Sequence, residues 1–267
     1  MRVISLILIT FVALCSGASL FGAEPQHDAA KDAVVARETV CQYMRDAAAI
    51  EWTPAEDIKY WTTGEPFTFK SGETYFGIPY TQNARDHDLA SFKTKLESRD
   101  GRLTYFGPNT PQLYWGNDCS SCVSHAWRRV DPEFPTLDTL TMLPNRQERI
   151  ATVGDYQVGQ ANTTQEIVES NGAERIARAY AQLQPGDAVL RRLSSGHVML
   201  VLKNDPENRR VFIADQTGCD QGVPMGRDGR STMRVDHEQS YDRLLKNFYI
   251  PIRLKAIADL EAQACQE

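Results

Sequence analysis

The sequence predicts an α+β fold in which helices precede an antiparallel sheet. Residues 29–50 are rich in alanine and carry a rough stripe of apolar residues at helical spacing. Residues 188–190, 197–202 and 211–215 are short apolar runs bounded by turn residues, which is typical of strands. Helical patterns that come first and strands that come later favour an α+β arrangement.

Smaller elements are predicted between and after these runs. Residues 184–187 form a turn, and residues 171–174 resemble a capping box at the start of a helix over residues 173–183. Pro251 favours an edge position for a strand over residues 248–254, because proline lacks the N–H that pairing needs. The remaining expectations are a surface helix, a loop, a glycine-rich surface loop and two late helices, over residues 86–99, 101–115, 218–229, 241–247 and 257–264.

Length and composition indicate a globular protein with one large domain or two small ones. The chain has 267 residues, of which 42% are hydrophobic and 24% charged, and its formal net charge is −6. That balance is typical of a folded chain and not of a disordered one. Because no run of Lys or Arg dominates, nucleic acid and anionic lipid are poor candidate partners.

The first residues are typical of an export signal. Arg2 gives a short positive start, an apolar run too short to span a bilayer covers residues 4–14, and small residues follow. We therefore expect residues 1–23 to be a signal peptide, cleaved after Ala18 or after Ala23. The protein is expected in the periplasm or outside the cell, with no integral membrane span once the signal is removed.

Five of the six cysteines lie after the predicted signal peptide. An odd number leaves at least one thiol free or paired outside the chain. In an oxidising compartment a free thiol often has a chemical role. Cys41 and Cys265 could join the two ends of the mature chain, but spacing alone establishes no pairing among Cys41, Cys219 and Cys265.

Cys119 is the strongest candidate for a nucleophile. Asp118 is a favourable N-cap, and apolar residues from Cys122 to Val130 recur at three- and four-residue spacing, so a buried amphipathic helix is expected to begin here. Cys119 then falls in the first turn of that helix. Unpaired backbone N–H groups at a helix N-terminus favour a thiolate, which is the form in which cysteine attacks.

His197 is the candidate base, because it opens the apolar strand over residues 198–202 and its ring could face the start of the helix. A third polar group should orient the imidazole. Asp215, at the end of the next strand, is the first choice for that role and Gln216 the second. Each residue alone could be structural, but the helix, the strands and their order fit one catalytic site.

Four short motifs resemble those of the NlpC/P60 superfamily of cysteine peptidases. Residues 118–121 (DCSS) resemble its DCSG-type nucleophile motif, and residues 183–189 (LQPGDAV) resemble its L-x-PGD-hydrophobic turn. Residues 196–198 (GHV) resemble its histidine strand, and residues 77–80 (GIPY) resemble its G-x-PY segment. The four motifs stand in the family's order, and the resemblance covers roughly residues 75–218, about half of the chain.

The resemblance implies a papain-like core, in which the nucleophile helix packs on an antiparallel β-sheet. It implies a catalytic domain over residues 75–267 and, before it, an N-terminal helical extension over residues 24–74. The sequence departs from the family's pattern at Ser121, where glycine is common, and in the long interval between Tyr80 and Asp118. Many members also use histidine as the third catalytic residue.

The resemblance further implies hydrolysis of an amide bond in a peptide, such as the stem peptide of cell-wall peptidoglycan, through a thioester on the cysteine. The expected partner is therefore a peptide or a peptidoglycan fragment, and no metal or organic cofactor is expected. The backbone N–H of the nucleophile would be one oxyanion donor. The expected catalytic residues are Cys119, His197 and Asp215, and the residues expected near the substrate or the oxyanion are Tyr80, Asp118 and Gln216.

Three other interpretations remain open. Cys119 and Cys122 form a C-x-x-C pair at a helix start, which is also the layout of thiol–disulfide oxidoreductases. That reading leaves His197 unexplained, and no apolar strand precedes the pair. A papain-like fold could also have lost turnover and bind a wall fragment, or could transfer the acyl group to an amine or a lipid. His125, on the same predicted helix, is read as a packing or surface histidine.

Overall fold

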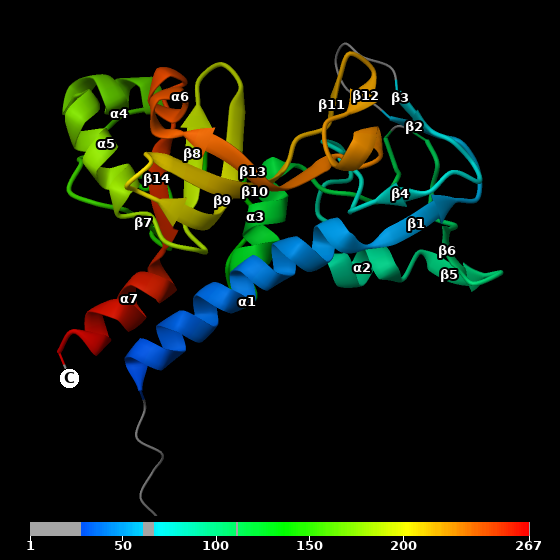
Figure 1. Ribbon diagram of the computed structural model, residues 1–267, viewed down its shortest axis with the longest axis horizontal. Coiled ribbons are helices and arrows are strands. Elements are labelled where there is room, and N and C mark those ends of the chain that lie inside the picture. Colours follow the sequence, from blue (N-terminus) through cyan, green and yellow to red (C-terminus); the bar gives the residue numbers. More distant parts are fainter. Residues whose placement is uncertain (1–27, 61–66, 111, 267) are drawn as a thin grey trace, which may run out of the picture.

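Two lobes lie on either side of a central helix in the computed structural model, which describes residues 28–60, 67–110 and 112–266 (Figure 1). The central helix is α3 (Cys119–Trp127), and the long helix α1 (Ala29–Ala49) runs below the lobes in this view. The predicted signal peptide, residues 1–23, lies outside the described residues. No described helix is both long and apolar enough to cross a membrane.

The larger lobe is built on a six-stranded sheet whose neighbouring strands are all antiparallel, in the order β13-β10-β9-β8-β14-β7. Central strands β9 and β10 are rich in Val, Leu and Ile, which suits a sheet covered on both faces. The bounds are Ile150–Thr152 for β7, Ala188–Arg192 for β8, Gly196–Asp205 for β9, Arg210–Gln216 for β10, Met233–Ser240 for β13 and Ile250–Leu254 for β14.

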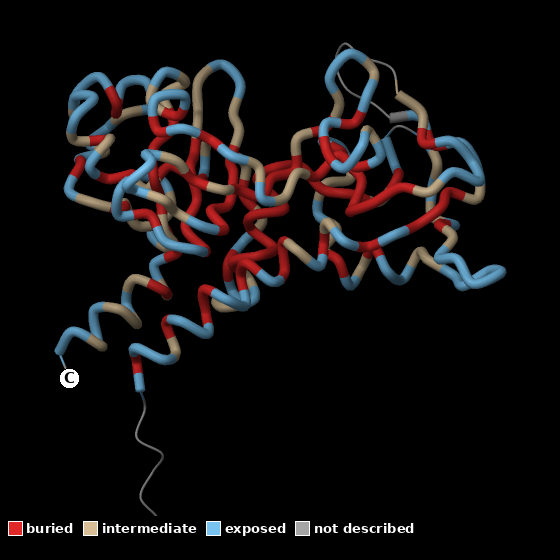
Figure 2. Tube along the Cα trace, viewed as in Figure 1, coloured by how far each residue is buried: buried red, intermediate tan, exposed pale blue. Residues whose placement is uncertain are grey.

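Helices cover this sheet from several sides. Helix α3 packs on β9 and β10, and α1 packs on α3 and on the same strands. Helices α4 (Thr164–Asn171) and α5 (Ala173–Ala181) contact β14, while α6 (Tyr241–Lys246) contacts α5. Helix α7 (Lys255–Ala264) follows β14 and packs along α1. Figure 2 shows the consequence, since α3 and the central strands are buried while the outer loops of both lobes are exposed.

The smaller lobe contains a four-stranded sheet in the order β4-β1-β6-β5 and the short helix α2 (Leu89–Lys93). Its core is a cluster of aromatic rings around Trp52, whose ring centroid lies 5.4–5.8 Å from those of four neighbours, Phe69, Tyr75, Phe92 and Tyr105. The strand bounds are Glu51–Pro54 for β1, Tyr75–Phe76 for β4, Leu96–Arg99 for β5 and Arg102–Tyr105 for β6. Two hairpins complete the lobe: β2 (Ile58–Tyr60) with β3 (Phe67–Phe69), and β11 (Cys219–Asp220) with β12 (Val223–Pro224).

Asp187, the aspartate of the PGD turn, joins the first and last helices to the large sheet. Its side chain is fully buried and accepts hydrogen bonds from Arg37 of α1 (3.0 Å) and from both Nε and Nη2 of Arg253 in β14 (2.8 Å each). Both arginines also bind Glu261 of α7. The backbone N–H of Gln184 donates to the same carboxylate at 2.8 Å. Every acceptor of the buried carboxylate therefore has a donor, as burial of a charge requires.

The expectation that helices combine with an antiparallel sheet is confirmed at that level, but the order of elements is not. Among its described residues, the predicted helical extension over residues 24–74 is helical only in α1, because the chain turns at Ile50 and enters β1 at Glu51. The aromatic residues that follow α1 bury themselves in a second sheet of their own. Helices and strands are therefore interleaved along the chain, and the smaller lobe is a feature that the sequence pattern did not predict.

Several local expectations were also wrong. The surface helix expected over residues 86–99 is only α2 and is followed by β5, and the loop expected over residues 101–115 contains β6. The capping box at residues 171–174 is absent, since Gly172 is the N-cap of α5 and makes no side-chain cap. Asn171 instead bonds backbone groups of Gln157 and Ile167.

Pro251 is not on an edge strand, because β14 lies between β8 and β7. The β14–β7 pairing covers Ile252 to Leu254, and the carbonyl of Pro251 accepts the N–H of Val153 just beyond the end of β7. In an antiparallel ladder the N–H and C=O of one residue point to the same side. The missing N–H of Pro251 therefore faces the place where β7 has ended, so its loss breaks no pair within the ladder.

Candidate active site

The N-terminus of α3 is fixed by a reciprocal capping box around Asp118. The Asp118 carboxylate accepts the backbone N–H of Ser121 (2.8 Å) and the Ser120 hydroxyl (2.9 Å), while the Ser121 hydroxyl accepts the N–H of Asp118 (2.9 Å). The predicted N-cap is thus confirmed. Arg85 donates to the other Asp118 oxygen at 3.1 Å. The carboxylate of Asp118 is engaged in capping and in this ion pair, and not in a contact with Cys119 or His197.

Cys119 is the first residue of α3, and its side chain is buried with a small exposed fraction of 7%. Its thiol is free. Helix geometry leaves the N–H of this residue without an acceptor inside the helix, because the first four N–H groups of a helix have none. Cys119 therefore combines a sulfur atom with a backbone donor at the positive end of a helix.

His197 joins Cys119 to Asp215. Its Nε2 lies 2.7 Å from Oδ2 of Asp215, and Cys119 is close enough to influence the pKa of the ring. With Nε2 engaged by the carboxylate, Nδ1 is the nitrogen left for the thiol. Of the two residues predicted to orient the imidazole, Asp215 makes the hydrogen bond. This order of sulfur, imidazole and carboxylate is the arrangement that a nucleophile, its proton carrier and an orienting group require.

The charges around His197 favour its protonated form. Burial alone would lower its pKa, but negative charge on Cys119 and the hydrogen bond to Asp215 raise the pKa of His197 from 6.5 to about 10. Burial would likewise raise the pKa of Asp215, but hydrogen bonds from His197 and Arg234 hold it below its usual value. At neutral pH the site is therefore an imidazolium held between a carboxylate and a sulfur atom.

Arg234 of β13 is a further member of this site. It is the direct partner of Asp215 in the β10–β13 pairing, and it donates to that carboxylate from Nε at 2.9 Å and from Nη2 at 2.5 Å. Such a two-point contact fixes the plane of a carboxylate as well as its charge. Arg234 could not be predicted as a site residue, because the run over residues 233–240 is polar and lacks the pattern of a strand.

The register of the sheet explains how these side chains meet. Ala214 pairs with Leu200, so Asp215 shares a face with Met199 and His197, since side chains alternate along a strand. Gln216 faces the other way. It is fully buried, and its amide donates to Ile78 O (2.7 Å) and Asn117 Oδ1 (2.9 Å). Gln216 therefore ties segments together behind the site, and the expectation that it contacts the substrate, the oxyanion or His197 has no support in these contacts.

Tyr80 reaches the site although 38 positions separate it from Asp118 in the sequence. The N–H of Thr81 donates to Asn117 O (3.0 Å), and the N–H of Asn117 donates to Pro79 O (3.2 Å). Between them, a Cβ on Gly116 would lie 2.1 Å from Pro79 O, so only glycine permits this approach. Burial, with negative charge on Cys119 next in effect, raises the pKa of Tyr80 far above its ordinary value. Tyr80 is thus a protonated hydroxyl within electrostatic reach of Cys119.

A second glycine sets the position of His197. A Cβ on Gly196 would lie 1.8 Å from Oγ1 of Thr139, so a larger residue would push β9 away from the segment that carries Thr139. The glycine of the GHV motif is therefore a packing requirement immediately beside the histidine.

The other thiols differ from Cys119 in their surroundings. Cys122 has no exposed surface and donates to the sulfur of Met44 at 3.6 Å, and burial raises its pKa well above the usual range. Burial also raises the pKa of Cys41 to about 11. Both thiols are therefore held in the unreactive protonated form. Cys265 is an exposed free thiol beyond α7, so the structure shows no bond between Cys41 and Cys265.

His125 is a packing histidine and not a member of the site. It is buried on α3, and burial together with Arg128 lowers its pKa from 6.5 to about 4. Its Nε2 lies 3.5 Å from the Asp86 carboxylate and has no hydrogen-bond partner among the described residues.

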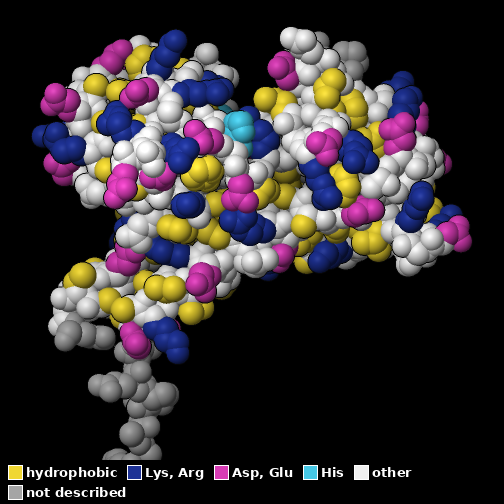
Figure 3. All heavy atoms as spheres, in the orientation of Figure 1, with side chains coloured by type: hydrophobic (Ala, Val, Ile, Leu, Met, Phe, Trp, Pro, Cys, Tyr) yellow, Lys and Arg dark blue, Asp and Glu magenta, His cyan; other side chains and the backbone are white. Residues whose placement is uncertain are grey.

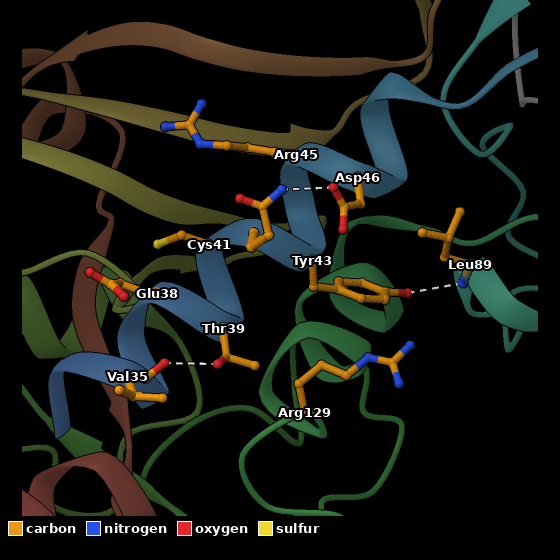
Figure 4. A pocket seen from close by; sticks show the side chains of 10 residues that line it. Val35, Glu38, Thr39, Cys41, Tyr43, Arg45, Asp46, Leu89 and Arg129 are labelled. Atoms are coloured by element: carbon orange, nitrogen blue, oxygen red, sulfur yellow. Dashed lines mark hydrogen bonds between the residues drawn. The ribbon is translucent and has the colours of Figure 1, made fainter. Parts of the chain in front are cut away.

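Two of the hollows on the surface can be followed in the figures. Figure 3 shows one between the two lobes, where a histidine side chain lies beside basic side chains. The other lies against the outer face of α1 and is lined by Cys41, Tyr43, Leu89 and Arg129, with the Tyr43 hydroxyl accepting the N–H of Leu89 (Figure 4). Within the described residues, no group of three or more His, Cys, Asp or Glu side chains could hold a metal ion.

Comparisons of the chain with protein-family models, curated proteins and solved structures found no match. The chemistry of the site is therefore inferred from its own geometry.

Proposed function

We propose that the protein is an exported cysteine hydrolase that cleaves an amide bond in a peptide, through a thioester on Cys119. The observation that carries the proposal is the pair of partners on His197, which are the thiol of Cys119 and the carboxylate of Asp215. A papain-like fold of the NlpC/P60 type would account for a nucleophile helix packed on a histidine-bearing antiparallel sheet. The stem peptide of peptidoglycan is the substrate class that this likeness favours.

The proposed reaction begins with attack of the Cys119 sulfur on the amide carbonyl carbon, which forms a C–S bond. Charge then develops on the carbonyl oxygen, where the backbone N–H of Cys119 would donate a hydrogen bond. The Tyr80 hydroxyl is the second candidate donor. Protonated His197 gives its Nδ1 proton to the leaving nitrogen, the C–N bond breaks, and a thioester and a free amine remain.

Hydrolysis of the thioester returns the site to its starting state. Neutral His197 accepts a proton from water, the resulting hydroxide attacks the thioester carbon, and the C–S bond breaks. The products are a carboxylic acid and the Cys119 thiolate beside the imidazolium. Asp215 keeps its hydrogen bond to Nε2 throughout, so that Nδ1 always faces the sulfur.

The contacts of Cys122 disfavour the thiol–disulfide alternative. A resolving cysteine must reach the first sulfur as a thiolate, and Cys122 is fully buried with a raised pKa. Transfer of the acyl group to an amine or a lipid would use the same residues. The products of the reaction therefore identify the acceptor.

The test is to incubate the protein with a panel of peptidoglycan stem peptides and ordinary peptides, and to analyse products and acid-quenched protein by mass spectrometry. We expect a new amine and a new carboxylic acid, and a transient acyl mass on Cys119 that the Cys119→Ala variant lacks. Amide products with an added amine would indicate transfer instead. Cleavage that persists in Cys119→Ala, or no product and no adduct across the panel, would reject the proposal.

A further inference from the structure

Arg191 of β8 is a cation beside the site, and no carboxylate of the described residues forms an ion pair with it. We infer that Arg191 is a specificity-determining residue that binds a carboxylate of the substrate, next to the amide bond that reacts. The inference rests on the proposed function, and it narrows the substrate class to peptides with an acidic group beside the scissile amide.

The position of Arg191 follows from strand pairing. It is the direct partner of His197 in the β8–β9 ladder. Directly opposed residues leave the same face of an antiparallel sheet with their Cβ atoms about 5 Å apart. Arg191, His197, Asp215 and Arg234 therefore form one row of charged side chains across β8, β9, β10 and β13.

The guanidinium of Arg191 lacks the acceptors that the neighbouring arginines have. Arg234 is bound to Asp215 and Arg253 to Asp187, whereas no salt bridge joins Arg191 to any carboxylate of the described chain. Its Nε is buried and has no hydrogen-bond partner among those residues. An arginine donor that is buried without an acceptor costs stability, unless a ligand supplies the acceptor.

The ring of Tyr249 lies against the guanidinium of Arg191. The Arg191 carbon Cζ lies 5.7 Å from the centroid of the Tyr249 ring, within the range of a cation–π contact. Tyr249 in turn lies within electrostatic reach of Cys119, Asp215 and Arg191. A contact with an aromatic face orients the guanidinium but leaves its N–H groups available, and these match a carboxylate in a two-point contact.

The remaining charges near the sulfur are already balanced. Arg85 is paired with Asp118, and Arg234 with Asp215. His197 is hydrogen-bonded to Asp215 as well. Among the arginines of this row, Arg191 is thus the one that no carboxylate of the described residues pairs with, and it favours an anionic group on the bound substrate.

The experiment compares two alkylating reagents that differ in charge, iodoacetate and iodoacetamide, and measures the rate of Cys119 modification by mass spectrometry. Both displace iodide and form a C–S bond, so they report on the site without requiring turnover. The ratio of the two rates, divided by the same ratio for the exposed Cys265, measures how strongly the site prefers an anion. We expect Arg191→Met to lower that ratio about tenfold, mainly through the iodoacetate rate.

Matched variants make the result decisive. Arg192→Met removes a neighbouring positive charge whose side chain leaves the other face of β8, and it should leave the ratio unchanged. Arg191→Lys keeps the charge but not the two-point contact, and it should give an intermediate ratio. An unchanged ratio in both Arg191 variants, or an equal loss in Arg192→Met, would overturn the inference.

Turnover separates this inference from the proposed function. If the peptide panel is cleaved, Arg191→Met should lose the preference for an acidic residue over its amide (Glu over Gln, Asp over Asn) beside the scissile bond, by the same factor of about ten. If no peptide is cleaved but iodoacetate selectivity depends on Arg191, the anion site stands and the hydrolase proposal fails.

Discussion

Asp187 and Asp215 are both fully buried carboxylates that arginine side chains neutralise, yet their surroundings differ in one respect. The partners of Asp187 are Arg37 and Arg253, and both arginines also bind Glu261. A guanidinium group does not readily release a proton. The partners of Asp215 are Arg234 and His197, and His197 leads on to a thiol. The first cluster is a structural joint between α1, β14 and α7, whereas the second can move a proton.

This difference shows that burial and pairing of a carboxylate do not by themselves indicate function. What distinguishes the Asp215 region is a titratable partner that reaches a nucleophile at a helix N-terminus. Substitutions in the Asp215 region should therefore change the reactivity of Cys119, whereas those in the Asp187 cluster should change stability.

Asp215→Asn should have the largest effect on reactivity. Asparagine keeps the size of the side chain but removes the charge that orients and stabilises the imidazolium, so acylation by a cleavable peptide should slow by about 10³-fold or more. Pre-steady-state kinetics of amine release would measure it. Since the change also leaves Arg234 without its carboxylate, the rate must be taken per folded molecule, from circular dichroism. A rate within threefold of wild type would remove Asp215 from the proposed mechanism.

Asp187→Asn should instead reduce the free energy of unfolding by about 3–5 kcal/mol, because it leaves two buried guanidinium groups without their shared carboxylate. Urea unfolding would measure the loss. In the fraction that remains folded, the rate of Cys119 alkylation should match wild type. Loss of alkylation without loss of stability would mean that the Asp187 cluster is coupled to the site.

Alkaline pH should reduce the ionic stabilisation in the Asp215 region. It should leave the Asp187 cluster unchanged, because that cluster contains only guanidinium and carboxylate groups. Since the pKa of His197 is raised from 6.5 to about 10, its ionic stabilisation is complete below pH 6.5 and is lost as the pH rises through about 10. The loss should be on the order of a few kcal/mol in urea unfolding. In Cys119→Ser the imidazolium loses one of its anionic partners, so the loss should begin at lower pH; an identical pH profile would contradict a coupled pair.

Arg234→Lys should have the smallest effect. Lysine keeps a positive charge beside Asp215 but not the two-point contact, so the carboxylate plane is less fixed and acylation should slow by about tenfold, or about 1.4 kcal/mol. The pH at which His197 titrates, followed by NMR of its ring protons, should shift in the same variant. No change in either quantity would assign Arg234 to stability alone.

The sequence predicted the structure best at positions where the local geometry accepts only a few residue types. Asp118 before an amphipathic run predicted the helix cap, and the glycine–histidine pair at residues 196–197 predicted the start of β9. Of the six site residues named from the sequence, Cys119, His197 and Asp215 meet in space, while Asp118 caps α3 and Gln216 faces away. Tyr80 lies within electrostatic reach of Cys119.

The rest depended on tertiary pairing that one sequence does not reveal. The smaller sheet arises because β1 pairs with β6, about fifty residues later, around a cluster of aromatic rings. Arg234 and Arg191 join the site through register alone, as cross-strand partners of Asp215 and His197. A polar strand such as β13 has no hydrophobic alternation by which it could be recognised, and the register that places Arg191 opposite His197 cannot be derived from one sequence.

The most direct test of the proposed Cys119–His197 pair is the rate at which limiting iodoacetamide labels each cysteine across pH. The rates are compared in wild type and in His197→Ala, by mass spectrometry of the reduced protein. Cys119 should react fastest near neutral pH, faster than the exposed Cys265, while Cys41 and Cys122 stay unlabelled. His197→Ala should slow Cys119 at least about tenfold at pH 7 and leave Cys265 unchanged. Equal Cys119 rates in the two proteins, with a Cys119–Cys122 disulfide in the unreduced protein, would contradict a Cys–His pair and favour thiol–disulfide exchange.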